Sequence, residues 1–299
     1  MILLSGKQIA EQINRHTELL CRAFSERFSS KPCLAVILVG ENPSGRTYVN
    51  TKRKLCDLIG IESRLYEFDS SVTQKQLTDK VKSLNEDRCV DGILVQLPLP
   101  SHADESAVID VIDPGKDVDG FTPQNMGKLL LGGGRLISCT PKGILRLLDA
   151  YDIPVQSKSV CVIGRSNIVG KPVAALLLQR DRNATVMICH SFTDDVSRYT
   201  EKADIVIVAA GCPGLVTGNM IKEGSVVIDV GITRIPDSTK KSGFRLAGDV
   251  DFDSAVRKCS AITPVPGGVG PMTVAMLMEN TVIAACARRG ITDCEELLH

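Results

Sequence analysis

Apolar residues recur at two different spacings in the first hundred positions, and their alternation predicts helices and strands in turn. Helical spacing joins a first set of positions, Ile9, Ile13, Leu20, Phe24 and Phe28. A continuous apolar run at 33–39 follows and is typical of a buried strand. The same criteria predict a helix over 44–59, a strand over 62–68, a helix over 74–86 and a strand over 92–97. This order is typical of a parallel sheet covered by helices.

A second series of the same kind begins near Lys158. We expect strands over 159–163, 184–189, 203–211 and 225–231, helices over 173–179 and in a short stretch after the second strand, and a final helix over 273–288. A helix from Pro141 to about Ala150, capped by Thr140, is expected to connect the two series, because proline is tolerated at the first helical position. We therefore predict an α/β protein of two domains, 1–139 and 140–271, separated by a cleft, with a Rossmann-like second domain.

Composition narrows the class of partner. The 35 basic and 35 acidic side chains balance, so no overall field favours nucleic acid or an anionic membrane. The chain has no tryptophan and 4% aromatic residues, which argues against a stacking surface for single-stranded nucleic acid. The sequence suggests no secretory signal and no run long enough to span a bilayer. A small-molecule substrate is the natural expectation.

The eleven cysteines do not indicate a disulfide framework or a metal site. No two of them form a CxxC pair, and several lie inside apolar runs, among them Cys33, Cys161 and Cys189. We interpret them as reduced core residues of a cytoplasmic protein and expect no metal.

The second domain opens with a glycine turn between a strand and a helix. The segment GRSNIVGKP, from Gly164 to Pro172, follows the strand over 159–163 and precedes an apolar helix. Free amide groups and the dipole at a helix start favour a phosphate there. The spacing GxxxxxG meets the general dinucleotide fingerprint only loosely, and a tight structural turn is the alternative.

Two further positions concern the choice of cofactor. Arg165 lies in the turn, and the next strand ends with Cys189, His190 and Ser191, where an NAD enzyme usually carries an acidic residue. A carboxylate would repel a 2′-phosphate, whereas arginine and serine attract it. NADP is therefore the expected cofactor. His190 is equally well explained as a polar residue at a strand end.

The first domain carries candidate catalytic residues. Tyr48 and Lys52 are four apart, so they share one face of a helix. Short-chain dehydrogenases use such a pair after their nucleotide turn, whereas this pair precedes Gly164 by more than a hundred residues, and the order excludes that family. A solvated basic face, with Arg53 and Lys54, is the alternative.

Two later motifs add polar groups near strand ends. Gln96 ends an apolar strand in VQLPLP, and open α/β sheets bind ligands at the carboxyl ends of their strands. KDVDGF supplies Asp117 and Asp119 before Gly120. A glutamine bonded to its own loop, and turn carboxylates, are the structural alternatives.

Near the end of the chain, TPVPGGVGPMT places three prolines and four glycines in the eleven residues from Thr263 to Thr273. Proline fixes φ and permits a cis bond, and glycine lets a ligand approach the main chain. The alternative is an ordinary entry loop for the following helix, with Pro271 near its first position.

In this order, YVxxK, VQLPLP, KDVDGF, CTPKG with GRSxxVGxP, and TPVPGGVGPMT resemble the signature of the bifunctional methylenetetrahydrofolate dehydrogenase/cyclohydrolase family and cover nearly the whole chain. The resemblance implies NADP-dependent oxidation of 5,10-methylenetetrahydrofolate and hydrolysis of the methenyl product to 10-formyltetrahydrofolate, in one-carbon metabolism and purine biosynthesis. It also implies a homodimer joined through the nucleotide domains, and a C-terminal helix (272–299) that completes the first domain.

The resemblance assigns roles residue by residue. Asp119 is expected to hold the pterin ring, and Cys139 to line the binding site. The residues implied for the substrate are Tyr48, Lys52, Val95, Gln96, Leu97, Asp119, Pro266, Gly267 and Gly268. Those implied for the cofactor are Gly164, Arg165, Ser166, Ser191, Ile232, Cys139 and Thr140. Many members carry serine three residues before the tyrosine, whereas this chain has Gly45 there and Ser44 one place earlier.

The hypothesis for hydrolysis places Lys52 as the proton acceptor, oriented by Gln96 and packed with Tyr48; Lys52, Tyr48, Gln96 and Asp119 form the catalytic set. Lysine must be neutral to accept a proton, so burial or a nearby positive charge has to lower its pKa from about 10.4. Three alternatives remain at this point: a monofunctional dehydrogenase weakened at Gly45, a binding scaffold without turnover, and an NADP dehydrogenase for a small polar acid.

Overall fold

The structure is a computed structural model that describes residues 1–40, 43–240 and 243–298, with the backbone alone at Pro43 and Ser44. The question of a hydrogen bond from the Ser44 side chain therefore lies outside the described residues. The chain divides into two compact units. The three-stranded unit comprises Glu11–Lys128, Gly133–Cys139 and the chain from Val274 onward, and the six-stranded unit comprises Met1–Ala10, Leu129–Gly132 and Thr140–Thr273.

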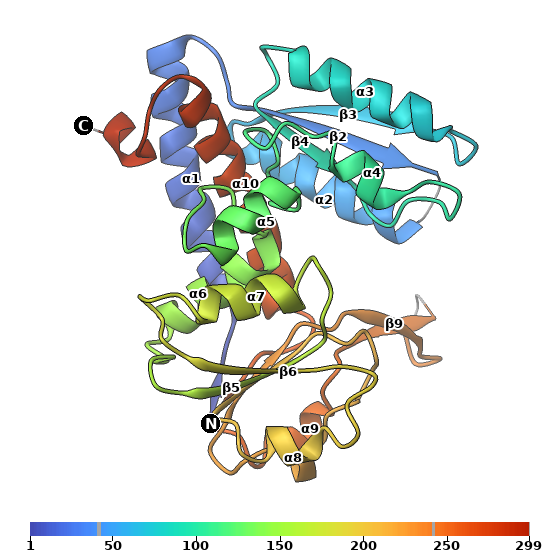
Figure 1. The fold of residues 1–299 in the computed structure, drawn as a ribbon, viewed down its shortest axis with the longest axis vertical. Coiled ribbons are helices and arrows are strands. Elements are labelled where there is room, and N and C mark those ends of the chain that lie inside the picture. Colours follow the sequence, from blue (N-terminus) through green and yellow to red (C-terminus); the bar gives the residue numbers. More distant parts are fainter. Residues whose placement is uncertain (41–42, 241–242, 299) are drawn as a thin grey trace. The chain divides into compact units, whose positions relative to one another are not determined.

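The three-stranded unit is built on a parallel sheet in the order β3-β2-β4. Its strands are β2 (Cys33–Val39), β3 (Glu62–Phe68) and β4 (Gly92–Val95). Every residue of β2 is buried, which explains its uninterrupted apolar sequence. Apolar residues of α3 (Gln74–Glu86) and α4 (Glu105–Ile109) pack on one face, and α2 (Pro43–Ile59) lies on the other (Figure 1).

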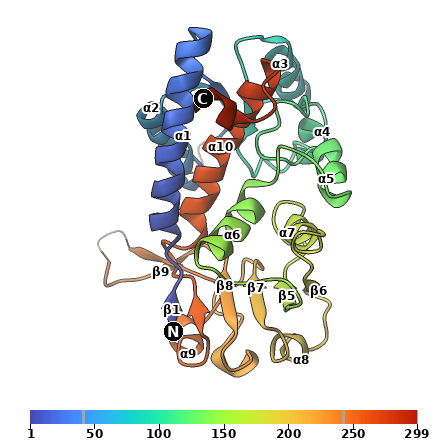
Figure 2. The same ribbon diagram turned by 90° about the vertical axis from the view of Figure 1, so that its left-hand side faces the viewer.

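Two long helices complete this unit. Figures 1 and 2 show α1 (Gly6–Phe28) and α10 (Val269–Arg288) side by side within it. Two further helices are α5 (Pro123–Leu130) and α6 (Cys139–Ala150), and the chain ends with the 3₁₀ turn η2 (Cys294–Leu298). The unit boundary falls inside α1, α5, α6 and α10, so these helices contribute residues to both units, and α6 belongs to the six-stranded unit except for Cys139.

The six-stranded unit contains a wholly parallel sheet in the order β1-β11-β8-β7-β5-β6. Its strands are β1 (Ile2–Leu3), β5 (Ser159–Ile163), β6 (Thr185–Cys189), β7 (Ile205–Val208), β8 (Val226–Asp229) and β11 (Ala261–Ile262). Within this unit, α7 (Gly170–Leu177) covers one face, while α8 (Ser197–Thr200) and α9 (Phe252–Ala255) lie on the other (Figure 1). Gly218–Met220 forms a 3₁₀ turn, η1.

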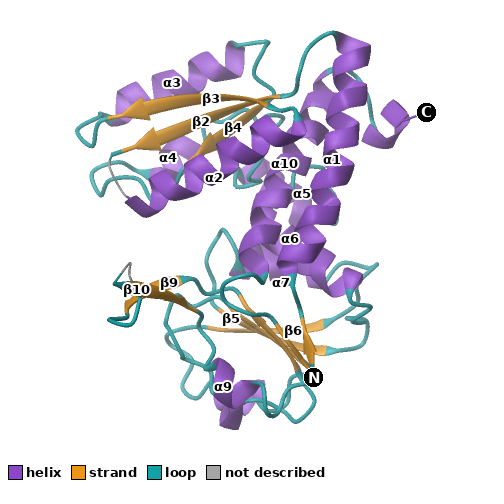
Figure 3. Cartoon of the chain, turned by 180° about the vertical axis from the view of Figure 1, so that it is seen from behind, coloured by secondary structure: helices purple, strands orange, loops and turns teal. Residues whose placement is uncertain are grey.

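A separate antiparallel hairpin belongs to the six-stranded unit. It consists of β9 (Thr233–Pro236) and β10 (Phe244–Ala247), and it follows β8 in the chain (Figure 3). Residues 241–242 between the two strands are not described.

The two α/β series and their parallel sheets confirm the fold class predicted from the pattern. The structure differs at the N-terminus, where β1 was not expected: it pairs in parallel with β11, and Leu4 donates its N–H to the Ile262 carbonyl at 2.8 Å. Residues 1–10 therefore group with the six-stranded unit, whereas the expected limits placed them in a domain 1–139. A two-residue strand has too short a pattern for sequence periodicity to reveal.

Helix starts and strand ends also differ from expectation. Helix α6 begins at Cys139, so Thr140 lies in its first turn and does not precede it as a cap. Helix α10 begins at Val269, four residues before the expected start, and Pro271 lies in its first turn. Proline is tolerated there, because the N–H groups of the first turn have no partner within the helix. Strand β4 ends at Val95, which leaves Gln96 in the following loop.

One correction concerns membrane-spanning potential. Among the described residues, α10 is long and apolar enough to cross a bilayer by length and composition, contrary to the expectation that no run would be. Yet 72% of its most apolar window is buried within the protein. This burial is typical of a core helix.

Candidate active site

Lys52 is a buried amine with two defined neighbours in the three-stranded unit. Its side chain projects from α2, and the residue is only 5% exposed. The Nζ donates a hydrogen bond to Gln96 Oε1 at 3.1 Å and lies 4.4 Å from the ring centroid of Tyr48. The structure therefore brings together the tyrosine and lysine four residues apart on α2 and a glutamine from the loop after β4.

The Gln96 amide is held in a fixed orientation. Its Nε2 donates to the carbonyl of Leu97 at 2.9 Å, which leaves Oε1 as the acceptor facing Lys52. Val95, the last residue of β4, is buried, and Leu97 is half-buried beside Gln96. Gln96 therefore makes both kinds of contact: its Nε2 bonds its own loop, and its Oε1 accepts from Lys52.

Burial governs the titration of this group. Desolvation lowers the pKa of Lys52 from its ordinary value, and the negative charge of Asp119 opposes that shift. Desolvation also raises the pKa of Asp119 to about 6, while Lys52 pulls it down. Burial raises the pKa of Tyr48 as well, so its hydroxyl stays protonated. The site therefore holds an amine and a carboxyl whose protonation changes nearer to neutrality than in water.

The two carboxylates of KDVDGF have different roles. Asp117 is buried and accepts hydrogen bonds from the N–H groups of Phe121 (3.1 Å) and Thr122 (2.7 Å) and from Asn125 Nδ2 (2.9 Å). Asp117 therefore has the structural role in a turn that the sequence analysis gave as the alternative to ligand binding. Asp119 is partly buried and interacts with Lys52 and with the Cys139 thiol.

The loop that carries Asp119 is fixed by Cys139, which the sequence analysis named, and by Asn280, which it missed. Asn280 is fully buried in α10, and its Nδ2 donates to the carbonyls of Val118 and Ile137, each at 2.8 Å. Cys139 Sγ donates to the same Val118 carbonyl at 3.3 Å. The signal for Asn280 was a lone amide inside an otherwise apolar helix, because a buried amide must find partners.

Lys116 is another buried amine, and its role is structural. Its Nζ donates to the carbonyls of Leu84 (2.8 Å), Asn85 (2.8 Å) and Asp87 (2.7 Å) at the end of α3. Three carbonyl acceptors satisfy every N–H of an ammonium group. Lys116 therefore joins the end of α3 to the loop that carries Asp119.

In the glycine turn of the six-stranded unit, Gly164 and Gly170 have no room for a side chain. Gly164 has φ = +119°, and a Cβ there would lie 2.2 Å from the Ala209 carbonyl oxygen. A Cβ on Gly170, the first residue of α7, would lie 2.1 Å from the Gly164 carbonyl oxygen. Ser166 Oγ accepts from the N–H groups of Val169 (3.1 Å) and Gly170 (3.4 Å). The turn thus brings main chain close to the start of α7, as a phosphate site requires.

Arg165 and Ser191 lie at adjacent strand ends. Both are exposed, and β5 and β6, which precede them, are neighbours in the sheet. The Arg165 guanidinium carbon lies 5.7 Å from the ring centroid of Phe192, the residue after Ser191. His190 is held by its own loop, since its N–H donates to Thr193 Oγ1 (2.9 Å) and its Nδ1 accepts from Phe192 N–H (3.2 Å). An exposed arginine beside a serine, with no carboxylate at this strand end, fits a phosphorylated ribose.

The remaining sequence-predicted residues of this unit lie on two segments. Gly267, with φ = +108°, accepts from the N–H of Lys7 at 3.0 Å, and a Cβ on Gly6 would lie 1.8 Å from the Gly268 carbonyl oxygen. Pro266 follows a cis peptide bond. Thr140 Oγ1 is hydrogen-bonded to Thr273 Oγ1 at 2.9 Å, and Ile232, after β8, is 58% exposed.

The expected residues form one group in each unit. Tyr48, Lys52, Val95, Gln96, Leu97, Asp119 and Cys139 belong to the three-stranded unit; Thr140, Gly164, Arg165, Ser166, Ser191, Ile232 and Pro266 to Gly268 belong to the six-stranded unit. Among the described residues, no cluster of three or more potential ligands could hold a metal ion. The chain combines a parallel sheet that carries a glycine turn with a buried amine hydrogen-bonded to an amide. These features are typical of an α/β dehydrogenase that also has a site for proton transfer.

Comparisons with known proteins specify the family. Residues 4–119 match the tetrahydrofolate dehydrogenase/cyclohydrolase catalytic domain, and residues 138–289 match the NAD(P)-binding domain of the same family. The chain is 50% identical to a bifunctional protein FolD from Prosthecochloris aestuarii, over 94% of this chain and 97% of that protein. The chain belongs to the tetrahydrofolate dehydrogenase/cyclohydrolase family.

Solved structures agree with this assignment. The bifunctional FolD enzyme of Campylobacter jejuni superposes with a TM-score of 0.91 at 47% identity, covering 96% of this chain and 99% of that one. The Trypanosoma brucei enzyme, complexed with NADP cofactor and inhibitor, gives a TM-score of 0.92 at 39% identity, covering 97% and 99%. The family resemblance and the Rossmann-like nature of the six-stranded unit are thereby confirmed.

Proposed function

We propose that this protein catalyses two consecutive reactions of one-carbon metabolism. It oxidises 5,10-methylenetetrahydrofolate to 5,10-methenyltetrahydrofolate with NADP, and it hydrolyses the methenyl compound to 10-formyltetrahydrofolate. The observation that carries this proposal is the buried Lys52 amine, hydrogen-bonded to Gln96, in a chain that belongs to the family with both activities. A binding scaffold has no need of a desolvated amine there, and the match of both domains to the folate family favours these reactions over the oxidation of a small acid.

Hydrolysis is assigned to Lys52. Burial lowers its pKa, which increases the fraction of neutral amine able to take a proton from the attacking water. Gln96 fixes the direction of one N–H and so orients the amine. Tyr48 packs its ring beside the Nζ, where it stabilises the ammonium formed after proton transfer. A cationic methenyl substrate lowers the lysine pKa further by charge repulsion.

Substrate binding is assigned to a carboxylate and a set of loop residues. Asp119, when ionised, suits the donor edge of a pterin ring, since two carboxylate oxygens accept from two neighbouring N–H groups. The other proposed substrate residues are Val95, Leu97, Pro266, Gly267 and Gly268. Within 1–139, the catalytic domain is proposed to begin after residues 1–10, which group with the six-stranded unit, and to be completed by 272–299; the nucleotide domain is proposed to span 140–271.

NADP binding is assigned to the glycine turn and its neighbours. The lack of room for a Cβ at Gly164 and Gly170 supports a phosphate at the start of α7. The proposed cofactor residues are Gly164, Arg165, Ser166, Ser191, Ile232, Cys139 and Thr140. When bound, the nicotinamide supplies the acceptor for the hydride. The chain's own contribution is to orient both reactants.

A coupled assay tests the two activities together. With 5,10-methylenetetrahydrofolate and NADP, NADPH absorbance is expected to rise while methenyl absorbance passes through a maximum and falls. Failure to form NADPH contradicts the proposal. Methenyl compound that accumulates and hydrolyses no faster than without enzyme indicates a monofunctional dehydrogenase, the outcome that the glycine at position 45 suggests as an alternative.

The choice of cofactor is tested by Arg165→Ala. We expect the KM for NADP to rise about 10- to 100-fold and the KM for NAD to change little, because the guanidinium interacts with the 2′-phosphate. Arg180→Ala, at another exposed arginine of the six-stranded unit, serves as the control and should leave both KM values unchanged. Equal changes in the two KM values contradict the assignment.

We further propose a cytoplasmic homodimer joined through the nucleotide domains, with product entering purine biosynthesis. The cysteines support a reducing compartment, because no disulfide joins any two of them in the described part of the chain. The edge strand β6 supports the dimer, because it has an unpaired side and exposes Ile188. We expect neither nucleic acid nor a membrane as a partner.

A further inference from the structure

Two buried carboxylates tie together the loops that follow β7 and β8. Asp249 Oδ2 accepts from the N–H groups of Ala210 (2.7 Å) and Gly211 (2.8 Å), in the loop after β7. Asp229 ends β8, and its Oδ1 accepts from Gly231 N–H (3.0 Å) and Asp249 N–H (2.9 Å). Its Oδ2 accepts from Val250 N–H at 3.0 Å. Side chains at two positions therefore fix three main-chain segments.

The surrounding glycines make space for these carboxylates. A Cβ on Gly231 would lie 2.3 Å from Asp249 Oδ1, and a Cβ on Gly248 would lie 1.9 Å from Asp229 Oδ2. Asp249 is fully buried, and in the described part of the chain its Oδ1 has no hydrogen-bond partner. A buried carboxylate with an unsatisfied oxygen lowers stability. Its presence calls for a gain elsewhere.

The position of the loop after β7, at the carboxyl end of the sheet, indicates a functional reason to keep Asp249 there. In the order β8-β7-β5-β6, the chain goes from β5 to β6 on one side and to β7 on the other, so the ends of β5 and β7 form the switch point where such sheets bind ligands. The turn after β5 and the loop after β7 are in close contact there, since Gly164 has no room for a Cβ beside Ala209. Arg165 and Ser191 occupy the β5–β6 side. The β7–β8 side is left for the other half of a dinucleotide.

We propose that Asp249 is a positioning residue for hydride transfer. Through the N–H groups of Ala210 and Gly211 it holds the loop after β7 against the glycine turn, in the conformation that receives the nicotinamide half of the cofactor. Asp229 supports Asp249 by accepting its main-chain N–H. This proposal rests on the proposed NADP-dependent function, and it concerns a residue that does not itself contact the reacting atoms.

The test compares substitutions at Asp249 in the full-length protein. Asp249→Ala removes the acceptor of both amides, and we expect the KM for NADP to rise at least about 10-fold with a fall in dehydrogenase kcat of about 10-fold. Asp249→Asn keeps one oxygen for both amides and should stay within about 3-fold of the wild type. Hydrolysis of methenyltetrahydrofolate should stay within about 2-fold in both, because the proposed proton acceptor, Lys52, and its neighbours Tyr48 and Gln96 lie in the three-stranded unit.

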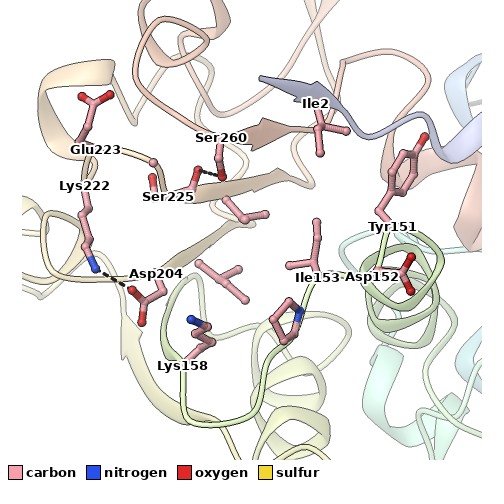
Figure 4. A pocket seen from close by; sticks show the side chains of 14 residues that line it. Ile2, Tyr151, Asp152, Ile153, Lys158, Asp204, Lys222, Glu223, Ser225 and Ser260 are labelled. Carbon is pink, nitrogen blue, oxygen red and sulfur yellow. Dashed lines mark hydrogen bonds and ion pairs between the residues drawn. The ribbon is translucent and has the colours of Figure 1, made fainter.

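Asp204 provides a matched control at the opposite end of the same sheet. Its Oδ2 accepts from Ser159 N–H at 3.0 Å and its Oδ1 pairs with Lys222 at 2.7 Å. Figure 4 shows this pair beside a cavity of about 340 Å³. Asp204→Ala also frees a main-chain amide, so it should lower stability while leaving the KM for NADP within about 2-fold. An unchanged KM in Asp249→Ala, or an equal rise in Asp204→Ala, overturns the proposal.

Hydrogen exchange on the wild-type protein gives a second test that needs no variant. Without NADP, the amides of Ala210 and Gly211 should exchange at least about 100-fold more slowly than free peptide amides, because the loop is already held. Exchange at the rate of free amides overturns the proposal. If the wild type does not bind NADP, the proposed function fails, while the exchange rates still report on the loop.

Discussion

Lys52 shows how the environment of one side chain determines its chemistry. The four-residue spacing of Tyr48 and Lys52 was enough to predict that they share a helix face, and their contact agrees with it. The partner amide, Gln96, was expected only from the family resemblance, because it is 44 residues away in sequence and spacing alone cannot show that it reaches Lys52 through the pairing of β2 with β4. The segment around Lys52 by itself favoured a solvent-exposed side chain, and burial excludes that alternative.

Replacement of Lys52 tests its role as proton acceptor. Lys52→Met, or Lys52→Gln, should lower the rate of methenyltetrahydrofolate hydrolysis by at least about 100-fold, since general-base catalysis contributes about 10²- to 10⁴-fold. NADP affinity should be unchanged. In the wild type, the rate should rise with pH through a midpoint below the usual lysine pKa, because burial lowers the pKa of Lys52. Lys54→Met, an exposed neighbour on α2, is the control, and undiminished hydrolysis by Lys52→Met would refute the assignment.

Asp119 should make stability depend on pH. Its pKa in the folded protein, about 6, lies above the value of about 3.9 in an unfolded chain, so the ionised carboxyl disfavours folding. The contribution of this group to stability is therefore fully present below pH 4 and is lost as pH rises through 6. Asp119→Asn stays neutral, and at pH 8 its free energy of unfolding should exceed that of the wild type by about 3 kcal/mol.

Denaturant unfolding at pH 4 and pH 8 measures this difference. The gain of Asp119→Asn should shrink toward zero at pH 4, where both side chains are uncharged. Asp57→Asn, at an exposed position of α2, should show no such dependence. A variant that is less stable than the wild type at pH 8 would show that the interaction with Lys52 outweighs desolvation.

At the scale of elements, periodicity predicted the type of most helices and strands, and local chemistry decided where they end. Helix α3 matches its expected range because Thr73 and Gln76 form a capping box at its start. The start of α10 was misplaced because glycine and proline at 270–271 are typical of a loop, yet both fit the first turn of a helix. Strand β1 was missed because the residues of its partner, β11, lie 259 positions later in the chain and form an equally short strand.

The end of α3 provides a prediction at this scale. Lys116→Met leaves the carbonyls of Leu84, Asn85 and Asp87 without their donor; the first two lie in α3 and the third at its C-cap. We expect a loss of about 3 kcal/mol in the free energy of unfolding, because unsatisfied buried acceptors are costly. Lys82→Met, on the exposed side of α3, should change it by less than about 0.5 kcal/mol. Equal stabilities of the two variants would contradict the role of Lys116.

At the scale of the whole molecule, the fold class and the order of motifs could be read from the sequence, whereas the assignment of segments to units could not. Sequence treats residues 1–139 as one stretch, but main-chain hydrogen bonds at Ile2 and Leu4 bind the first residues to β11. Only the three-dimensional pairing reveals this, since nothing in MILL distinguishes a strand from the start of a helix. The proposed substrate and cofactor residues likewise come from both units, and only the structure shows which unit holds each of them.

The proposed dimer is testable through its edge strand. Ile188→Lys places a charge on β6, where it should prevent pairing with a second copy and convert a dimer to a monomer in light scattering after size-exclusion chromatography. Ile2→Lys, at the opposite edge strand β1, is the control and should leave the mass unchanged. A wild type that elutes as a monomer, or an Ile188→Lys variant that remains a dimer, contradicts the proposed interface.

The edge position of β1 bears on how the protein can be dissected. Excision of 140–271 as a separate polypeptide would strip β11 of its outer neighbour and leave an open row of peptide groups, a surface prone to stick to other chains. Such a fragment would also lack Gly6 and Lys7, which abut the Gly267–Gly268 turn. A separately folded nucleotide domain would require residues 1–10 to be joined to it again, because the sheet of that domain is completed by a strand far from the rest of it in sequence.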